Sequence, residues 1–297
     1  MAHAGTSRIP ELRIDPDAKV RSGSIAELAR FVHDHQRIVV LTGAGCSTSS
    51  GIPAYRDPSG RWRGRHPIFY QDFLNEPAMR RRYWARSYFG WSAMRDARPG
   101  RTHSALAGLA RAGRVSGLIT QNVDGLHQRA GHAGIIELHG GLERVICLDC
   151  GLGVGRDDVQ EQLETLNPDW APEVLGINPD GDAELDASLD KRAYPGFRIA
   201  GCPDCGGTLK PDVVFFGESV PKQRLVAADG LVETADALLV VGTSLVVWSG
   251  FRLARQAAER GIPLVALNDG LTRADALLAF KLGGDCGEAL DRALALM

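Results

Sequence analysis

Short apolar runs that alternate with amphipathic helices constrain the fold of this 297-residue chain more than any other feature. Five runs are typical of buried strands: residues 37–45, 115–122, 134–141, 237–245 and 262–268. Apolar side chains recur at helical spacing in residues 24–36, 102–113 and 251–261, and a final helix begins near Gly287. Ser24 or Ser22 could cap the first of these helices. The alternation predicts an α/β fold with a doubly wound, Rossmann-like parallel sheet.

Glycine or polar residues follow each predicted strand at its carboxyl end. The strands are followed in turn by Gly-Ala-Gly, Gln-Asn, His-Gly, Gly-Thr-Ser and a single asparagine. In doubly wound sheets, ligands bind in the crevice outside the carboxyl ends of the strands. The sequence therefore predicts that these residues gather in one site.

The first motif, Gly43-Ala44-Gly45-Cys46-Ser47, directly follows a strand. Glycines at this point let the backbone approach a pyrophosphate, and the N–H groups of the next helix can bind an anion. Any tight strand-to-helix turn can use the same glycines, and the two interpretations are equally supported by the motif alone. The full GxGxxG pattern and a ribose-binding acid on the next strand are both missing, which disfavours an ordinary dehydrogenase.

Two further motifs carry polar side chains that could take part in chemistry. In residues 120–127 (TQNVDGLH), Gln121, Asn122 and Asp124 could contact ribose, an amide or a water, although capping of a short helix is the simpler interpretation. His139 follows a buried strand, where a histidine is usually a satisfied core residue. Its ordinary pKa near 6.5 nevertheless suits a general base.

Six cysteines form two CxxC pairs and two isolated residues, Cys46 and Cys286. In a chain without a secretion signal, paired CxxC spacing favours zinc over disulfides. The pairs supply four sulfur ligands, which leave no open position for water, so the zinc would be structural. A redox pair or unrelated thiols are the alternatives. The four predicted ligands are Cys147, Cys150, Cys202 and Cys205.

Composition and the breaks in the alternation set the expected organisation. The formal net charge of −2 gives no basis for nucleic-acid binding driven by charge, and no run reaches the roughly 20 apolar residues of a membrane span. The start of the chain lacks an apolar targeting segment, so we expect a cytoplasmic protein. The predicted parts are an N-terminal arm (1–23), a Rossmann-like domain (24–142 and 209–297, with a mobile loop and small helices about 51–91) and an inserted small zinc-binding domain (143–208).

Taken in order, six motifs resemble the sirtuin family over nearly the whole chain from about Ile25. They are GAGCSTSSGIPAYR, TQNVDGLH, ELHG, the two CxxC pairs, KPDVVFFGE and VGTSL. Within the family, RYWARSYFGW, RVICLDCG, LETLNPDW and PDGD resemble the class II branch, which includes a mitochondrial member. Cys46 stands where an aliphatic residue is usual, and Ser49 where an acid is common. Cys46 could make this loop sensitive to oxidation, but its simpler interpretation is a small buried hydrophobe.

The resemblance implies an NAD-dependent protein-lysine deacylase acting on acylated-lysine proteins or peptides, with no nucleic-acid or membrane partner. In that mechanism the acyl-lysine carbonyl oxygen attacks the nicotinamide ribose and nicotinamide leaves. His139 then deprotonates a ribose hydroxyl, which attacks the acyl carbon, and water completes the transfer of the acyl group to ADP-ribose. Asn122 and Asp124 would hold ribose, water and nicotinamide in place, with His139 as the catalytic base.

The resemblance also implies the remaining contacts. Cys286 would act through its backbone. The cofactor-binding set is Gly43, Ala44, Gly45, Ser47, Tyr55, Arg56, Gln121, Asn122, Asp124, His139, Gly242, Thr243, Ser244, Asn268 and Cys286. The substrate peptide would add a strand along Val214, Phe215, Phe216, Gly217 and Glu218, with the phenylalanines lining an acyl tunnel. Without the resemblance, a plain buried strand is an equal interpretation of this segment.

Arginines are frequent in the first interruption of the pattern. They are Arg56, Arg61, Arg63, Arg65, Arg80, Arg81, Arg82 and Arg86. A solvated basic face is the simpler interpretation; the alternative is that one or two point inward and select acidic acyl groups or clamp the pyrophosphate.

Two other functions stay open. NAD-dependent protein ADP-ribosyl transfer would use the same cofactor site. A zinc-bearing binding module with a vestigial pocket is disfavoured because Gln121, Asn122, Asp124 and His139 are all present.

Overall fold

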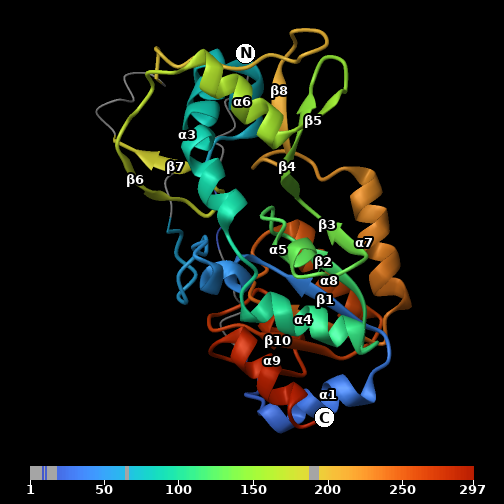
Figure 1. Ribbon diagram of the computed structural model, residues 1–297. Helices are drawn as coiled ribbons and strands as arrows, with labels where there is room; N and C mark the ends of the chain where they lie inside the picture. The colour runs from blue at the N-terminus through green and yellow to red at the C-terminus, as the bar shows by residue number, and fades with distance from the viewer. Residues whose placement is uncertain (1–8, 10, 12–18, 64–66, 187–193) are drawn as a thin grey trace. The chain divides into compact units, whose positions relative to one another are not determined.

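The computed structural model describes residues 9, 11, 19–63, 67–186 and 194–297, and the chain divides into two compact units (Figure 1). The first, here called the sheet unit, comprises Pro10–Arg63, Ala97–His139 and Val220–Met297. The second, here called the cysteine unit, comprises Met1–Ile9, Gly64–Asp96 and Gly140–Ser219.

The sheet unit is built on a six-stranded parallel sheet with the order β11-β10-β9-β1-β2-β3. Its strands are β1 (Ile38–Thr42), β2 (Val115–Thr120), β3 (Ile135–Glu137), β9 (Ala237–Val241), β10 (Leu264–Leu267) and β11 (Phe280–Leu282). From β1 the chain proceeds to one side, through β2 and β3, and later returns to the other side, through β9 and β10. The order reverses between β1 and β9, and this is the switch point where doubly wound folds bind ligands. The predicted fold class is confirmed.

Helices cover both faces of this sheet (Figure 1). One face carries α1 (Ile25–Asp34), α4 (Arg101–Arg111) and α9 (Cys286–Leu294), and the other carries α7 (Lys222–Thr234) and α8 (Trp248–Glu259). Successive residues of β1 alternate between the two cores: Val40 belongs to the first, and Val39 and Leu41 to the second. Because both faces are covered, the central strands β1, β9 and β10 are buried along their whole length, as the sequence predicted, whereas β3 at the edge of the sheet is half-buried.

Local signals explain where the helices of the sheet unit begin and end. Ser24 caps α1: its hydroxyl accepts from the Glu27 N–H at 3.2 Å, and the Glu27 carboxylate accepts from the Ser24 N–H at 2.9 Å. This reciprocal pair is a capping box. The predicted cap is therefore Ser24, whereas Ser22 forms an isolated bridge with Lys281. Short helical turns fill the loops at η1 (Ala44–Ser50), α5 (Leu126–Arg129) and η3 (Asp275–Leu277).

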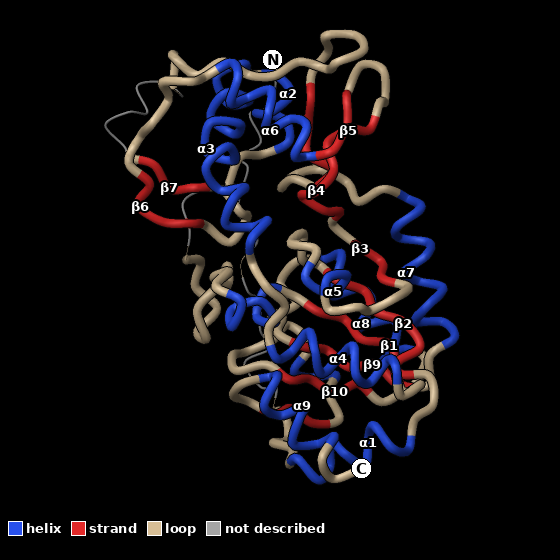
Figure 2. Tube along the Cα trace, in the orientation of Figure 1, coloured by secondary structure: helices blue, strands red, loops and turns tan. Residues whose placement is uncertain are grey.

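Among its described residues, the cysteine unit combines two small antiparallel sheets with the helices α2, α3 and α6 (Figure 2). The larger sheet has the order β5-β4-β8, with β5 (Gly153–Gly155), β4 (Gly140–Cys147) and β8 (Leu209–Val213). The smaller pairs β6 (Val174–Ile177) with β7 (Ala183–Leu185). The helices are α2 (Tyr70–Asn75), α3 (Pro77–Asp96) and α6 (Arg156–Leu166).

Helix α3 differs from the small helices expected near residues 51–91, since it spans 20 residues. Its pattern was hard to interpret because a charge lies among its buried side chains: Arg86 is buried beside Trp84 and Ala85. Arg86 donates to the Ala183 carbonyl at 3.0 Å and lies 3.7 Å from the Asp182 carboxylate. The paired arginine interrupts the apolar periodicity without breaking the helix.

Along the described residues, no helix combines the length and apolar character needed to cross a lipid bilayer.

Candidate functional site

Two glycine loops meet at the switch point of the sheet unit. The N–H of Gly43, after β1, donates to the Val241 carbonyl at 3.1 Å, and the N–H of Gly45 donates to the Gly242 carbonyl at 2.8 Å. A Cβ on Gly45 would lie 2.8 Å from the Gly242 Cα, and Gly242 adopts a φ of 62°. Only glycine allows this approach and this conformation. The contact between the two loops is therefore enough to explain the glycines without any ligand. The glycines also leave a stretch of backbone without side chains, which a diphosphate could approach closely.

Asn122, Asp124 and Ser47 form one buried network beside these loops. The Asn122 amide nitrogen donates to the Gly43 carbonyl and to the Ser47 hydroxyl, each at 3.1 Å. The Ser47 hydroxyl in turn donates to an Asp124 carboxylate oxygen at 2.7 Å. The other Asp124 oxygen accepts from the Leu126 N–H at 2.9 Å, so the aspartate also stabilises the start of α5. This contact agrees with the simpler interpretation of the motif, in which it caps a short helix.

Gln121 links the ends of three adjacent strands. Its side-chain nitrogen donates to the Thr42 carbonyl at 3.2 Å and to the Thr243 hydroxyl at 3.0 Å, while Gln121 itself follows β2. Gln121, Asn122, Asp124 and the glycine loops are thus brought together at one edge of the sheet, as predicted.

Both ring nitrogens of His139 are held at this same edge. Nδ1 lies 3.0 Å from the Gln121 carbonyl oxygen, and Nε2 lies 2.8 Å from the Ser249 hydroxyl. A carbonyl only accepts, so Nδ1 carries the proton and Nε2 is the basic nitrogen of the neutral ring. Burial lowers the pKa of His139 to about 4; the Gln121 carbonyl opposes this shift, and Arg224 adds to it. The half-buried imidazole is therefore neutral near pH 7 and able to accept a proton.

Several residues of this edge escaped the sequence-based prediction. Thr42 and Thr120 end two paired strands and share a 2.9 Å hydrogen bond between hydroxyls, and Thr42 also contacts His127 at 3.0 Å. Their place at strand ends was a usable signal. His103 lies 3.4 Å from the Ser47 hydroxyl. It sits in the first turn of α4, where its Nδ1 accepts from the Gly100 N–H at 3.1 Å, and nothing in the sequence marked its contact with Ser47. Ser249 was missed as well.

The predicted adenosine-side residues follow β9 and β10, except Cys286, which is the first residue of α9. Thr243 accepts from Gln121 as described, and the Asn268 side chain donates to the Gly270 carbonyl at 2.9 Å. The Cys286 thiol donates to the Leu267 carbonyl at 3.3 Å, and burial raises the pKa of this thiol to about 12. Burial also raises the pKa of Cys46 well above its ordinary value. Both thiols are therefore inert packing groups, which favours the hydrophobic interpretation of Cys46.

Tyr55 and Arg56 lie in a turn of the sheet unit that follows η1. Arg56 donates to the Gly60 carbonyl at 2.8 Å and lies 5.4 Å from the centre of the Trp62 ring, on which Tyr55 also packs at 5.3 Å. Burial lowers the pKa of Arg56. A Cβ on Gly270 would lie 2.6 Å from the Pro58 carbonyl, so this turn packs beside the loop that follows β10.

The four cysteines of the CxxC pairs converge in the cysteine unit. The sulfurs of Cys147 and Cys205 lie 3.5 Å apart, those of Cys150 and Cys202 lie 3.7 Å apart, and all four lie within 4.8 Å of one another. A tetrahedral zinc with Zn–S bonds of about 2.3 Å separates its sulfurs by about 3.8 Å. The cluster therefore fits one zinc ion with no open position.

The predicted substrate segment forms a turn of the cysteine unit beyond β8. Glu218 closes this turn: its carboxylate accepts from the Phe215 N–H at 2.8 Å and from the buried Lys210 ammonium at 3.0 Å. The Phe216 carbonyl accepts from the Tyr70 N–H at 2.9 Å, and Gly217 has a φ of 81°. Val214 to Glu218 therefore do not continue the strand, contrary to the plain-strand interpretation.

The two phenylalanines of this turn have different surroundings. Phe215 packs on Phe73 and Tyr83, at 5.1 and 5.4 Å between ring centres, and so belongs to the core of the cysteine unit. Phe216 packs on Phe69 at 6.1 Å.

The arginines that point inward in α3 have structural partners. Arg80 donates to the carbonyls of Phe73 and Leu74 at the end of α2, and Arg86 pairs with Asp182 as described. Arg65 lies outside the described residues. These contacts favour a structural role for both arginines over selection of the acyl group.

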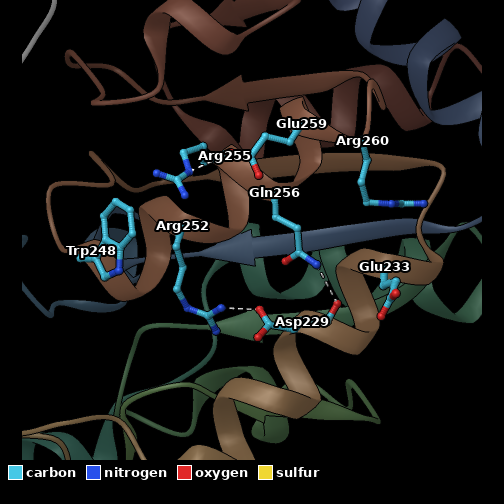
Figure 3. Close-up of a pocket in the computed structure, with 8 residues that line it drawn as sticks. All are labelled: Asp229, Glu233, Trp248, Arg252, Arg255, Gln256, Glu259 and Arg260. Atoms are coloured by element: carbon cyan, nitrogen blue, oxygen red, sulfur yellow. Dashed lines mark hydrogen bonds and ion pairs between the residues drawn. The ribbon is translucent and has the colours of Figure 1, made fainter.

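A surface hollow of about 710 Å³ between α7 and α8 is separate from this site (Figure 3). Figure 3 shows Arg252 directed at Asp229 and Gln256 directed at the backbone of the same residue, each with a hydrogen bond. Arg255 pairs with Glu259 at 3.0 Å. None of the predicted site residues lines the hollow.

The switch-point glycine loops, the strand-end polar network and the four-cysteine centre define a dinucleotide-binding α/β protein with a zinc module. Residues 43–249 match the model of the Sir2 family, and the chain belongs to this family. It is 51% identical to an NAD-dependent protein deacetylase of Xanthomonas campestris pv. campestris (strain 8004), over 89% of this chain and 88% of that protein. It is 48% identical to an NAD-dependent protein deacetylase of Bordetella bronchiseptica, over 91% and 97%.

Solved structures agree with this assignment. A structure described as "Sir2-p53 peptide-NAD+" matches with a TM-score of 0.73 at 31% identity, over 92% of this chain and 98% of that chain. Another, "Structural Basis for the Mechanism and Regulation of Sir2 Enzymes", matches with a TM-score of 0.70 at 31% identity over the same shares. The sirtuin resemblance is confirmed.

Proposed function

We propose that the chain is an NAD-dependent protein-lysine deacylase that transfers the acyl group to ADP-ribose and releases nicotinamide. Its curated relatives are named NAD-dependent protein deacetylases, and one similar structure is described with a peptide and NAD+. The observation that carries the proposal is His139, a neutral histidine held through both nitrogens at the switch-point edge of the sheet.

NAD, when bound, supplies a nicotinamide leaving group and the ribose hydroxyls that take up the acyl group. The protein's part is to hold the reacting groups and move one proton. Asn122 and Asp124 are rigid before any ligand arrives, because Ser47 and backbone groups fix their side chains. We assign them, with Gln121, to the ribose, the nicotinamide and the attacking water.

His139 accepts the proton at Nε2, the nitrogen that geometry leaves unprotonated. Burial keeps the ring neutral, since it lowers the pKa of His139 to about 4. The base is therefore in its reactive form throughout the neutral range without first losing a proton. The hydroxyl proton passes to Nε2, and the oxygen left behind can attack the acyl carbon.

We propose that the remaining predicted residues also bind the cofactor. The glycine floor of Gly43, Ala44 and Gly45 suits the diphosphate, with Tyr55 and Arg56 on the nicotinamide side. Gly242, Thr243, Ser244, Asn268 and the backbone of Cys286 would surround the adenosine half.

In the cysteine unit, the zinc cluster would be structural, because its four sulfurs close the coordination sphere. The domains proposed from the sequence are an N-terminal arm (1–23), an NAD-binding domain (24–142 and 209–297) and a zinc-binding domain (143–208). The compact units differ from these bounds, because residues 64–96 and 209–219 group with the four cysteines.

We propose that the acylated-lysine peptide pairs along Val214 to Glu218. Glu218 and Lys210 shape this turn, and Phe216 offers an aromatic wall for the acyl chain. We also propose the class II branch of the family. Two of the motifs that resemble this branch are in contact: Arg86 of RYWARSYFGW lies 3.7 Å from Asp182 of PDGD. A cytoplasmic location without nucleic-acid or membrane partners stays a prediction.

A panel of acyl-lysine peptides of equal length, incubated with NAD, tests the proposal. We expect nicotinamide release that depends on the acylated peptide and differs among acetyl, longer and acidic acyl groups. Release independent of every acyl peptide, with label from NAD transferred to protein, would instead support ADP-ribosyl transfer.

A further inference from the structure

Ser249 lies in the first turn of α8 and contacts the catalytic base proposed above, His139. The proposed mechanism gives this serine no role. Its hydroxyl oxygen lies 2.8 Å from Nε2, the nitrogen assigned to accept the proton. We propose that Ser249 is a positioning residue for the base and holds the imidazole in one orientation and one tautomer. This inference rests on the proposed function of His139 as the base.

The two contacts of the ring act together. The Gln121 carbonyl fixes Nδ1 as the protonated nitrogen, so the Ser249 hydroxyl must donate to Nε2 in the neutral ring. A flip of the ring would set its C–H groups against both partners. The clamp comes from two elements that are far apart in sequence, the end of β2 and the start of α8.

The start of α8 is built to bring this hydroxyl close. Val247, at the N-cap, provides no side-chain cap, and the serine of the first turn bonds the imidazole. A Cβ on the next residue, Gly250, would lie 2.5 Å from the Gln121 side-chain oxygen. Glycine thus allows the helix to approach Gln121, which in turn holds the other ring nitrogen.

A hydroxyl suits a base that changes its charge, because it both donates and accepts. When the ring is neutral, Ser249 donates to the Nε2 lone pair. Nε2 has a single lone pair, so the Ser249 hydroxyl must release it when the substrate hydroxyl arrives to give up its proton. Once that proton is on Nε2, the new N–H can donate to the serine oxygen, so Ser249 holds the ring before and after the transfer and keeps its own proton.

The main test compares Ser249→Ala with the wild-type enzyme in the acyl-peptide assay. We expect kcat to fall roughly tenfold, the effect of one hydrogen bond, while KM for NAD stays within about twofold. Ser249→Thr retains the hydroxyl and should restore most of the rate. The matched control is Ser116→Ala, because this exposed serine of β2 bonds only the Ile38 carbonyl and should leave the rate unchanged.

The pH profile separates positioning from packing. In Ser249→Ala, loss of the donor and entry of water should raise the pKa of His139 from about 4 toward its ordinary value. The charged group that acts on the ring from its surroundings is Arg224 of α7, which the substitution leaves in place. The acid limb of kcat/KM should therefore move to higher pH, with little loss at pH 7 and a large loss between about pH 4 and 6, where the variant ring is protonated and the wild-type ring is still neutral.

A titration of His139 by NMR, with and without Ser249, tests the inference independently of activity. A raised imidazole pKa in Ser249→Ala supports it even if the chain proves to have no deacylase activity, an outcome that would defeat the proposed function alone. An unchanged imidazole titration in Ser249→Ala, or an unchanged kcat with an unchanged acid limb, would overturn the inference.

Discussion

The two candidate centres of this protein are built in different ways. The strand-end centre of the sheet unit is formed by residues from several strand ends and helix starts. Backbone and side-chain hydrogen bonds hold these residues in place without a ligand. The zinc centre of the cysteine unit has four identical ligands from two short turns, and the metal itself supplies the geometry. The first should therefore lose function gradually as single contacts are removed, and the second all at once.

Loss of one zinc ligand is expected to have the largest effect. Cys202→Ser should abolish stoichiometric zinc and unfold the cysteine unit, because a structural zinc site contributes on the order of 10 kcal/mol to folding. Metal analysis and limited proteolysis measure this, with Cys46→Ala as the control that keeps its zinc. A stable variant with no zinc and full activity would show that the cluster is not a structural metal site.

Asp124→Asn comes next and addresses the strand-end centre. The substitution removes the charge that accepts from Ser47 and Leu126, yet keeps the size of the side chain. We expect the thermal midpoint to fall, since hydrogen bonds to a charged group contribute about 1.5–3 kcal/mol to the fold. We also expect kcat/KM for NAD to fall by roughly 10- to 100-fold in the variant that remains folded at the assay temperature. Asp34→Asn, at an exposed position of α1, is the control. Equal kinetics for the two variants would remove Asp124 from the site.

The free energy of unfolding of the sheet unit should depend moderately on pH, because its centre contains buried histidines, whereas the zinc centre contains none. Burial lowers the pKa values of four histidines of the sheet unit: His103, His127, His132 and His139. Their unfolded forms bind protons near pH 6.5 while the folded forms stay neutral, so the free energy of unfolding should fall as pH drops from about 7 to 5. Chemical denaturation followed by hydrogen exchange in β1 and β2 measures this. A constant value over that range would contradict the shifts.

The smallest effect is expected at the buried thiols. Cys46 packs in the core with its thiol on the Val241 carbonyl, so Cys46→Ala should cost about 1 kcal/mol and leave kcat unchanged. Thiol reagents should modify neither Cys46 nor Cys286 before unfolding, because burial raises the pKa of both. Rapid labelling of Cys46 in the native protein, with loss of NAD binding, would instead support an oxidation-sensitive loop.

The same contrast explains how far the sequence could predict the structure. Five of the six strands of the main sheet were predictable because their apolar runs are long; β11 was not, because it has only three residues with Lys281 between two apolar ones. The first helix cap could be narrowed to Ser24 or Ser22, because capping signals are local, and the structure selects Ser24. The four cysteines were predictable because zinc accepts a small set of ligands in two repeated turns. Ser249 and His103 were not, since each acts through tertiary contacts that leave no local pattern. Helix α3 was obscured by Arg86, whose partner Asp182 lies 96 residues further along the chain.

The proposed reaction depends on His139 as the base of an acyl transfer to ADP-ribose. The most direct measurement is mass spectrometry of the products formed from an acetyl-lysine peptide and NAD by the wild-type enzyme and by His139→Ala. We predict one acetylated ADP-ribose for each nicotinamide released by the wild type, and a rate reduced roughly 10²- to 10⁴-fold in a folded, zinc-loaded variant. Equal product formation by the variant, or ADP-ribosylated protein in place of acetylated ADP-ribose, would contradict the claim.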